Sequence, residues 1–154
     1  MTILVTYFSA SGVTKRVAEK IANALDADIF EIVPQTPYTS ADLDYTNSNS
    51  RSTIEMKDKS FRPPIRESID VSNYDTILFG FPVWWYTAPT IINTFIESID
   101  ISDKTAIAFC TSGGTGISGC ENDLKNAYPE ANWKPGKRLF GRESDEEIKN
   151  WVNE

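Results

Sequence analysis

Apolar residues in this chain gather in short continuous runs, separated by segments in which apolar and polar residues recur with a helical period. Four runs are rich in β-branched and aromatic residues: Ile3–Phe8, Ile29–Val33, Thr76–Val83 and Thr105–Thr111. A weaker fifth run, Trp133–Phe140, contains Pro135 and Gly136, and we expect it to start irregularly. Strands that are covered on both faces of a sheet have this continuous apolar pattern. The runs therefore predict a sheet with helices on both faces.

Amphipathic helices are predicted between the runs. From Val13 to Leu25, apolar residues recur at every fourth position, and charged residues fall on the opposite face. Three further helical patterns cover Ile91–Ile99, Ile117–Tyr128 and Glu143–Val152. In the last pattern, Ser144 and Glu147 have the spacing of an N-terminal capping box. The alternation of strands and helices predicts an α/β fold with a parallel sheet and right-handed crossovers.

One long segment departs from this alternation. Between Pro34 and Tyr74, about forty residues contain four prolines and the polar tract TNSNSRST. We expect one short helix in this segment, near Ala41–Tyr45 or near Ser52–Lys57. A connection of this length in a compact domain is usually functional or mobile.

The loop after the first run has the composition of an anion site. In a parallel α/β sheet, the loops that follow the strands meet at the carboxyl edge, where ligands bind. Gly12 permits a tight turn, and the helix that follows adds its dipole and its unpaired N–H groups. The hydroxyls of Ser9, Ser11 and Thr14 are further donors. Together they favour a phosphate site, with Ser11 as a simple helix N-cap as the alternative.

Three consecutive aromatic residues, Trp84, Trp85 and Tyr86, follow the third strong run. Consecutive residues cannot all face the core, so at least one ring must point outward, where an exposed indole suits stacking on a flat heterocycle. The alternative is that these rings pack beneath the long segment between Pro34 and Tyr74. We favour stacking.

The loop after the fourth run, Thr111–Gly116, contains three glycines and three hydroxyl-bearing residues. Its exposed N–H groups suit the carbonyl oxygens at the edge of a ring. A phosphate loop, an aromatic platform and a polar glycine loop at one sheet edge predict a phosphorylated flat heterocycle as the ligand. The sequence contains no Rossmann fingerprint, no Walker loop and no Cys-x5-Arg phosphatase loop.

On these residues the chain resembles the flavodoxin family over essentially its whole length. The most specific element is S-x-S-G-x-T at Ser9–Thr14, which is close to the phosphate loop of that family. The resemblance implies a three-layer α/β/α sandwich, a five-stranded parallel sheet of order 2-1-3-4-5, and FMN bound non-covalently at its carboxyl edge. It implies three groups of cofactor contacts: Ser9, Ser11, Gly12, Val13 and Thr14 around the phosphate; Pro82, Val83, Trp84, Trp85 and Tyr86 beside the isoalloxazine; and Ser112, Gly113 and Gly114 at its pyrimidine side.

The chain departs from the electron carriers of that family in one respect. Those proteins usually place a tyrosine after the fourth strand, stacked on the flavin, but the loop here has no aromatic residue. One flavin face would then be covered by the Trp84–Tyr86 segment alone, or by Tyr45 or Phe61 of the long segment. We expect the peptide near flavin N5 to be that of Gly80–Phe81 or that of Trp84–Trp85.

Composition limits the classes of function. At 154 residues the chain is expected to form a single domain, residues 1–154. Its net charge of −7 argues against binding nucleic acid or anionic membranes, and it favours basic partners. The sequence has no histidine, which argues against zinc chemistry and a Ser-His-Asp triad. With two cysteines, Cys110 and Cys120, no visible signal peptide and no apolar stretch of membrane-spanning length, we expect a cytoplasmic protein with idle thiols.

Three functions remain open at this point. The first is an electron-transfer protein that shuttles electrons between a reductase and acceptor enzymes with basic docking patches; its acidic surroundings would lower the potential of the reduced flavin. The second is an FMN-dependent NAD(P)H:quinone-type oxidoreductase, in which Arg51, Arg62 or Arg66 meets a substrate anion. The third is an interaction module without flavin, which the intact SASGVT loop disfavours. We favour the carrier, as a monomer, with a dimer as the alternative.

Overall fold

The computed structural model describes residues 2–44, 46–85, 87–112 and 116–153. Five parallel strands form one sheet in the order β2-β1-β3-β4-β5. The strands are β1 (Ile3–Tyr7), β2 (Asp28–Glu31), β3 (Thr76–Pro82), β4 (Thr105–Thr111) and β5 (Asn132–Arg138). The strand order is the expected one, and β4 has the predicted bounds.

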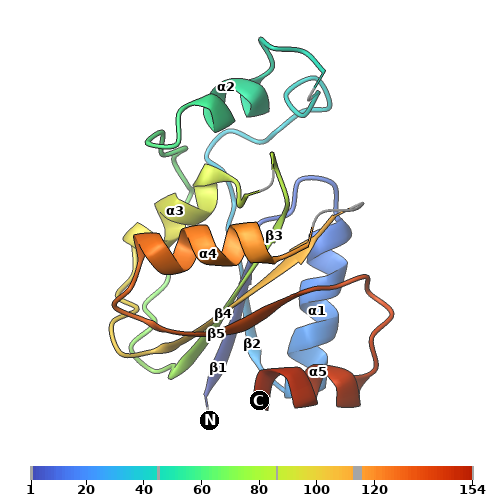
Figure 1. Cartoon of the computed structure of the whole chain (residues 1–154), viewed down its shortest axis with the longest axis vertical. Helices are drawn as coiled ribbons and strands as arrows, with labels where there is room; N and C mark the ends of the chain where they lie inside the picture. Colours follow the sequence, from blue (N-terminus) through green and yellow to red (C-terminus); the bar gives the residue numbers. More distant parts are fainter. Residues whose placement is uncertain (1, 45, 86, 113–115, 154) are drawn as a thin grey trace.

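Helices cover both faces of the sheet. They are α1 (Val13–Leu25), α2 (Arg51–Lys57), α3 (Thr90–Glu97), α4 (Ser118–Ala127) and α5 (Asp145–Asn153). Helices α1 and α5 lie on one face, and α3 and α4 lie on the other (Figure 1). The predicted three-layer α/β/α sandwich is confirmed. Of the two positions expected for a short helix in the long segment, the second is correct, because α2 overlaps Ser52–Lys57.

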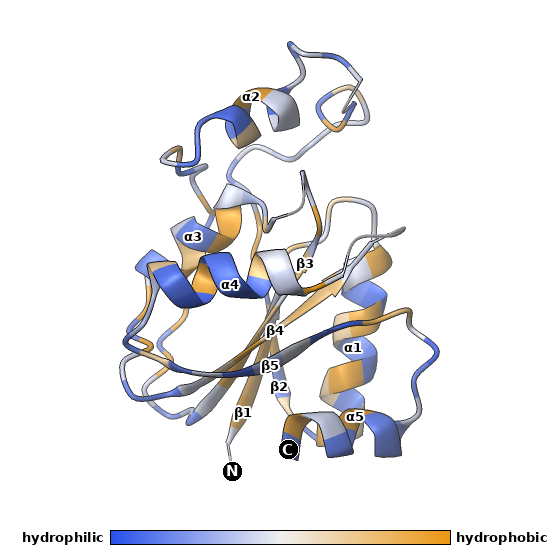
Figure 2. Cartoon of the chain, viewed as in Figure 1, coloured by the Kyte–Doolittle hydropathy of each residue, from blue (hydrophilic) through white to orange (hydrophobic). Residues whose placement is uncertain are grey.

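A separate hydrophobic core lies on each face of the sheet. On the α1 and α5 side, the rings of Phe109 and Trp151 meet edge to face, with their centroids 6.4 Å apart. On the α3 and α4 side, Phe79 and Phe95 pack with a centroid distance of 6.3 Å. The central strands are apolar along much of their length, whereas the helices carry both apolar and polar stripes (Figure 2). This double coverage explains the continuous apolar runs.

The edge strand β2 is less buried than its apolar sequence predicts. Ile29 is 42% exposed, and Phe30 is the half-buried residue of the strand. The Phe30 ring stacks on Phe95 of α3 at a centroid distance of 5.6 Å. The prediction of a strand covered on both faces is therefore wrong for β2, because Ile29, on the face opposite Phe30, is exposed at the edge of the sheet.

The irregularity expected at the start of β5 lies in its middle. The first three residues pair regularly with β4, and the register shifts between Ile107 and Phe109 of β4. Pro135 and Gly136 lie at this point of β5. Because proline has no N–H group for the ladder, the strand tolerates it through a bulge at the sheet edge.

The long segment, residues 34–74, extends beyond the carboxyl edge of the sheet and carries α2 (Figure 1). Its base is closed by an antiparallel bridge between Pro34 and Ile65. The N–H group of Arg66 also donates to the carbonyl of Val33 at 2.8 Å. The two ends of the segment therefore lie side by side, and the residues between them form a long insertion at the edge of the sandwich.

A buried carboxylate holds the turn after β5. Glu143 accepts hydrogen bonds from the N–H groups of Phe140 and Gly141, each at 2.9 Å. Burial raises the pKa of Glu143, but the backbone donors outweigh it and hold the pKa below its usual value. Helix α5 begins immediately afterwards, where the N–H group of Glu147 donates to Ser144 Oγ at 3.1 Å, so this half of the predicted capping box is present.

We expect Glu143→Gln to lower the free energy of unfolding by about 1–3 kcal/mol near neutral pH, because a neutral amide replaces a charged acceptor of two N–H groups. The folded-state pKa of Glu143 is lowered, so its stabilisation is present above the unfolded pKa and is lost as the pH falls through the folded pKa. Urea unfolding of both proteins, from about pH 7 down to about pH 2.5, should show the difference shrinking. A difference that stays constant over this range would contradict the assignment.

Candidate functional site

The strand ends that lead into the three predicted loops are joined by backbone hydrogen bonds. Strands β1, β3 and β4 are neighbours in the centre of the sheet. After β1, the N–H group of Phe8 donates to the carbonyl of Gly80 in β3 at 2.9 Å. After β3, the N–H group of Val83 donates to the carbonyl of Thr111, the last residue of β4, at 3.1 Å. The three loops therefore start from one continuous edge, as predicted.

The loop after β1 leads into an α1 N-terminus that no side chain of the described residues caps. Gly12 occupies the N-cap position with a φ of 93°, a conformation that glycine adopts without strain. Ser9 Oγ accepts a hydrogen bond from the N–H group of Gly12 at 3.0 Å, which fixes the turn. The alternative that Ser11 is the N-cap is therefore wrong. A helix start of this form is suited to an anion.

The other residues of this loop divide into exposed and buried ones. Ser11 and Val13 are exposed, whereas Thr14 is buried. Thr14 Oγ1 shares a hydrogen bond of 2.7 Å with Thr111 Oγ1, which ties α1 to the end of β4. The Thr14 hydroxyl, expected to be an available donor, is thus already engaged in packing the helix against the sheet.

Trp84 and Thr87 close a tight turn after β3. The N–H group of each residue donates to the carbonyl of the other, at 3.0 and 3.1 Å. Trp85, the first residue inside the turn, has a φ of 48°, which a bulky side chain rarely adopts. Its side chain is exposed, with 42% of the residue accessible. Tyr86 lies outside the described residues.

Trp84 is packed rather than exposed. Its ring meets Phe8 edge to face at a centroid distance of 5.7 Å and Tyr38 at 5.5 Å. Pro82 and Val83 are half-buried at the base of the turn. Each interpretation of the aromatic run therefore fits one residue: Trp84 packs beneath the long segment, and Trp85 is exposed as stacking on a ligand would require.

Tyr38 brings the long segment onto this aromatic cluster, a contact that sequence analysis missed. The Tyr38 ring also packs on Phe8, at 5.6 Å, and the Arg51 guanidinium carbon lies 3.8 Å from its centre. The Tyr38 hydroxyl donates to Glu55, whose carboxylate binds Arg51 Nε at 2.9 Å. Burial, with the bond to Glu55, raises the pKa of Tyr38 well above its usual value. The contacts of Arg51 with Tyr38 and Glu55 therefore give it a structural role within the long segment.

The loop after β4 is described in part. Of the three residues expected at the pyrimidine side, Ser112 is half-buried, whereas Gly113 and Gly114 lie outside the described residues. Arg138, the last residue of β5, donates from Nη2 to the Ser112 carbonyl at 3.1 Å. Sequence analysis missed Arg138; its one signal is its place at the carboxyl end of a parallel strand.

The peptide of Gly80–Phe81, one of the two expected near flavin N5, is part of the sheet. Both residues are buried inside β3, and the Gly80 carbonyl already accepts the hydrogen bond from Phe8. The other expected peptide, Trp84–Trp85, lies in the turn after β3, so we keep it as the prediction for the group near flavin N5.

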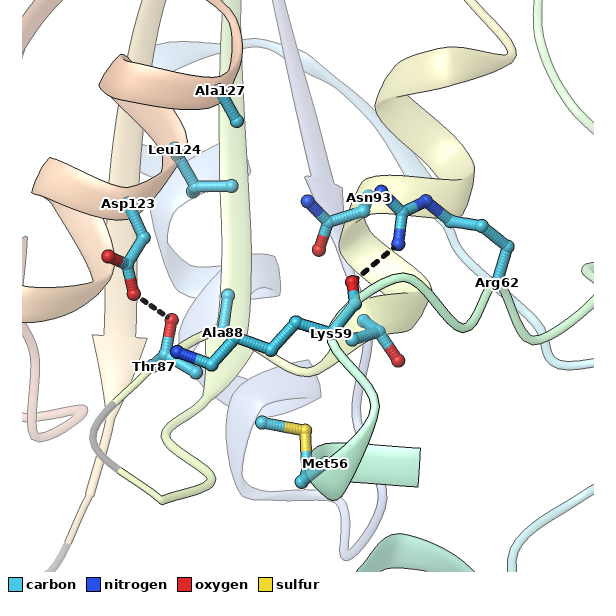
Figure 3. A pocket seen from close by; sticks show the side chains of 10 residues that line it. Met56, Lys59, Arg62, Thr87, Ala88, Asn93, Asp123, Leu124 and Ala127 are labelled. Atoms are coloured by element: carbon cyan, nitrogen blue, oxygen red, sulfur yellow. Dashed lines mark hydrogen bonds between the residues drawn. The ribbon is translucent and has the colours of Figure 1, made fainter. Parts of the chain in front are cut away.

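A cavity of about 280 Å³ lies beside the same turn (Figure 3). The long segment, the residues after β3, and helices α3 and α4 form its wall: Met56, Lys59, Arg62, Thr87, Ala88, Thr90, Asn93, Asp123, Leu124 and Ala127. The Thr87 hydroxyl donates to Asp123 at 2.5 Å. The Lys59 side chain extends across the cavity towards Thr87 (Figure 3).

Arg62 is fixed in the wall of this cavity. Its Nη2 lies 3.0 Å from Oε2 of Glu97, and its Nη1 donates to the carbonyl of Lys59 at 2.8 Å. The hydrogen bonds from Arg62 hold the pKa of Glu97 below its usual range. Arg66 is exposed. Of the three arginines considered for a substrate anion, Arg51 and Arg62 are therefore bound to carboxylates of the protein itself.

The part of the chain that the structure describes has no cluster of metal ligands, and its two cysteines are buried. Within residues 2–44, 46–85, 87–112 and 116–153, no group of three Asp, Glu or Cys side chains could hold a metal ion. Both cysteines are buried, and burial raises the pKa of Cys110 to about 11 and that of Cys120 to about 12. Among the same residues, no helix has the length and apolar character needed to cross a membrane.

Comparisons with known proteins agree with this geometry. A family model described as flavodoxin matches residues 2–154. A candidate flavoprotein from Bacteroides eggerthii, known from a crystal structure, is 46% identical over 99% of this chain and 96% of its own, with a TM-score of 0.95. A second one, from Bacteroides uniformis, is also 46% identical over 99% of this chain and 98% of its own, with a TM-score of 0.93.

A more distant structure contains a cofactor. This flavoprotein from Lactobacillus acidophilus, crystallised in complex with FMN, is 27% identical over 98% of both chains, with a TM-score of 0.76. No curated protein matches the chain. The family match extends over nearly the whole sequence. The chain belongs to the flavodoxin family.

Proposed function

We propose that this chain binds FMN and carries electrons between a reductase and acceptor enzymes. The observation that carries the proposal is the start of α1, where Gly12 is the N-cap and no described side chain caps the helix. Such a helix start binds phosphate groups. The relative from Lactobacillus acidophilus, crystallised with FMN, supports the same ligand.

Each loop has one task in holding the cofactor. The turn at Gly12, with Ser9 and Ser11, would bind the phosphate. Trp85, exposed in the turn after β3, would stack on the ring, and Ser112 would meet the pyrimidine edge. FMN supplies reversible electron transfer when bound, and the protein fixes its position and sets the charge around it.

The surface charge supports the role of a carrier. A net charge of −7 would attract the basic docking patches of reductases and acceptors and speed their encounter. Both cysteines are buried thiols, which fits a reducing compartment. We therefore propose that residues 1–154 act as a single FMN-binding domain, as a monomer in the cytoplasm.

An FMN-dependent NAD(P)H:quinone-type oxidoreductase is the second candidate. The observation that favours it is the cavity beside the Trp84–Thr87 turn, because a substrate needs a concave space close to the flavin. Lys59 extends across this cavity and offers a cation to an anionic substituent (Figure 3). The engagement of Arg51 and Arg62 by Glu55 and Glu97 counts against it.

An anaerobic titration separates the two functions. The FMN-loaded protein is mixed first with NADPH alone and then with NADPH and a flavodoxin reductase. A carrier stays oxidised with NADPH alone and becomes reduced once the reductase is added. Direct reduction by NADPH, followed by reoxidation with a water-soluble quinone, would contradict the carrier and support the oxidoreductase. Protein that takes up no added FMN would contradict both.

A further inference from the structure

Arg138 is a partly buried cation at the carboxyl edge of the sheet. It is in register with Cys110 of β4, and Cys110 belongs to the core beneath α3 and α4. Residues in register on neighbouring strands point to the same face, so Arg138 leaves the sheet on the α4 side. There its Nη2 donates to the carbonyl of Ser112, the residue expected at the pyrimidine edge of the flavin.

The Arg138 guanidinium has few partners for a group in this position. Its carbon lies 4.6 Å from the centre of the Phe140 ring, and Nε is buried with no hydrogen-bond partner among the described residues. The two ion pairs in the described part of the chain both involve other arginines. A guanidinium that is partly removed from water is unfavourable without an anion beside it. Its position therefore calls for an anion that the described side chains do not supply.

The charge of Arg138 acts on the end of β4. Burial raises the pKa of the Cys110 thiol, and the positive charge of Arg138 opposes this rise. The turn that follows Arg138 is also firmly held, because Glu143 binds the N–H groups of Phe140 and Gly141. A cation thus lies beside Ser112, directly after the end of β4.

We propose that Arg138 is the counter-cation of the reduced flavin. The inference rests on the proposed FMN site. When two electrons and one proton enter the isoalloxazine, with the proton at N5, the ring gains one negative charge, which is concentrated at N1 and the C2 carbonyl on its pyrimidine side. Arg138 stabilises this form more than the neutral oxidised ring. It offsets locally the acidic surface, which alone would disfavour the reduced state.

The test compares the affinity of the protein for oxidised FMN with its affinity for dithionite-reduced FMN, measured anaerobically, together with the midpoint potentials. Arg138→Met removes the charge and keeps an unbranched apolar stem. We expect it to weaken the binding of reduced FMN about tenfold more than that of oxidised FMN, which corresponds to about 30 mV in the two-electron midpoint potential. Arg138→Lys keeps the charge and should restore most of this ratio.

Arg142→Met is the matched control. It removes the same charge from the same aromatic ring, since the Arg142 guanidinium carbon lies 4.8 Å from the centre of Phe140, but Arg142 is exposed. Its charge is screened by water and salt, so the ratio of affinities should stay within about threefold of the wild-type value. An equal loss of both affinities in Arg138→Met, or the same shift in Arg142→Met, would overturn the inference.

Failure of the proposed function would give a different result. Wild-type protein that binds neither form of FMN refutes the function and, with it, the flavin as counter-ion of Arg138. Wild-type protein that binds both forms, with an unchanged ratio in Arg138→Met, refutes only the role of Arg138. If Arg138→Met does not fold, Arg138→Gln is compared with Arg138→Lys. A change in the ratio of affinities for reduced and oxidised FMN in Arg138→Gln alone supports the inference. The same ratio in both variants overturns it.

Discussion

Gly12→Ala is expected to weaken FMN binding by about tenfold or more, which is about 1.4 kcal/mol. Gly12 has a φ of 93°, and a residue with a Cβ adopts left-handed backbone only with about 1–2 kcal/mol of strain. An added Cβ would meet no atom within 4 Å, so the effect comes from the backbone rather than from a clash. The flavin-free variant can relax its loop, and the strain returns when the phosphate restores the turn. Titration calorimetry with FMN measures the loss.

Gly141→Ala is the control for backbone strain alone. Gly141 has a φ of 90°, and its added Cβ would meet Val17 Cγ2 at 3.7 Å, an ordinary contact. We expect its free energy of unfolding to fall by about 1–2 kcal/mol, as for any residue forced into this conformation. Its FMN affinity should stay within about twofold of wild type, because it lies after β5. Equal losses of affinity in the two variants would contradict a specific role for the turn at Gly12.

Trp85→Ala is expected to reduce FMN affinity by about 1–3 kcal/mol, or about fivefold to about 150-fold, with little change in folding stability. The reason is that Trp85 is exposed in a turn with a φ of 48° and contributes little to the core. Loss of an indole stacked on the isoalloxazine should also restore part of the flavin fluorescence on the protein. Affinity and fluorescence that both match wild type would exclude stacking by Trp85.

Trp84→Ala separates packing from ligand stacking. Trp84 packs on Phe8 and Tyr38, so its loss should lower the free energy of unfolding by about 2–3 kcal/mol. We expect chemical denaturation to show this large effect for Trp84→Ala and a change of less than about 0.5 kcal/mol for Trp85→Ala. The reverse order of the two effects would show that the two indoles have been assigned the wrong way round.

The elements of the fold that were predictable from the sequence are those with a local signal. The run Thr105–Thr111 is apolar along its length because it lies in the middle of a covered sheet, and it forms β4 with the same bounds. The turn at Gly12 was predictable because a glycine among hydroxyl residues, between a strand and a helix, is typical of a tight turn that binds an anion. The run at Ile29–Val33 shows what composition does not predict, because an apolar run can form either a central strand or an edge strand of the sheet.

The parts of the site that were not predictable depend on contacts between distant residues. The sequence predicts that the Thr14 hydroxyl is available to a ligand. In the structure it shares a hydrogen bond with Thr111, which lies 97 positions away in the chain. Tyr38 lies in a proline-rich segment without periodicity, so no local pattern places its ring on Trp84. Arg138 reads as one charge among many on an edge strand, and only the register with β4 brings it to Ser112.

The most direct test of the account compares the affinities of the wild-type chain for FMN and for riboflavin, which lacks the phosphate. The start of α1 offers a glycine turn and amides that no described side chain caps, so the phosphate should contribute several charge-assisted hydrogen bonds. We predict that FMN binds about a hundredfold more tightly than riboflavin. Equal affinities for the two flavins would contradict the claim that this helix N-terminus holds the cofactor.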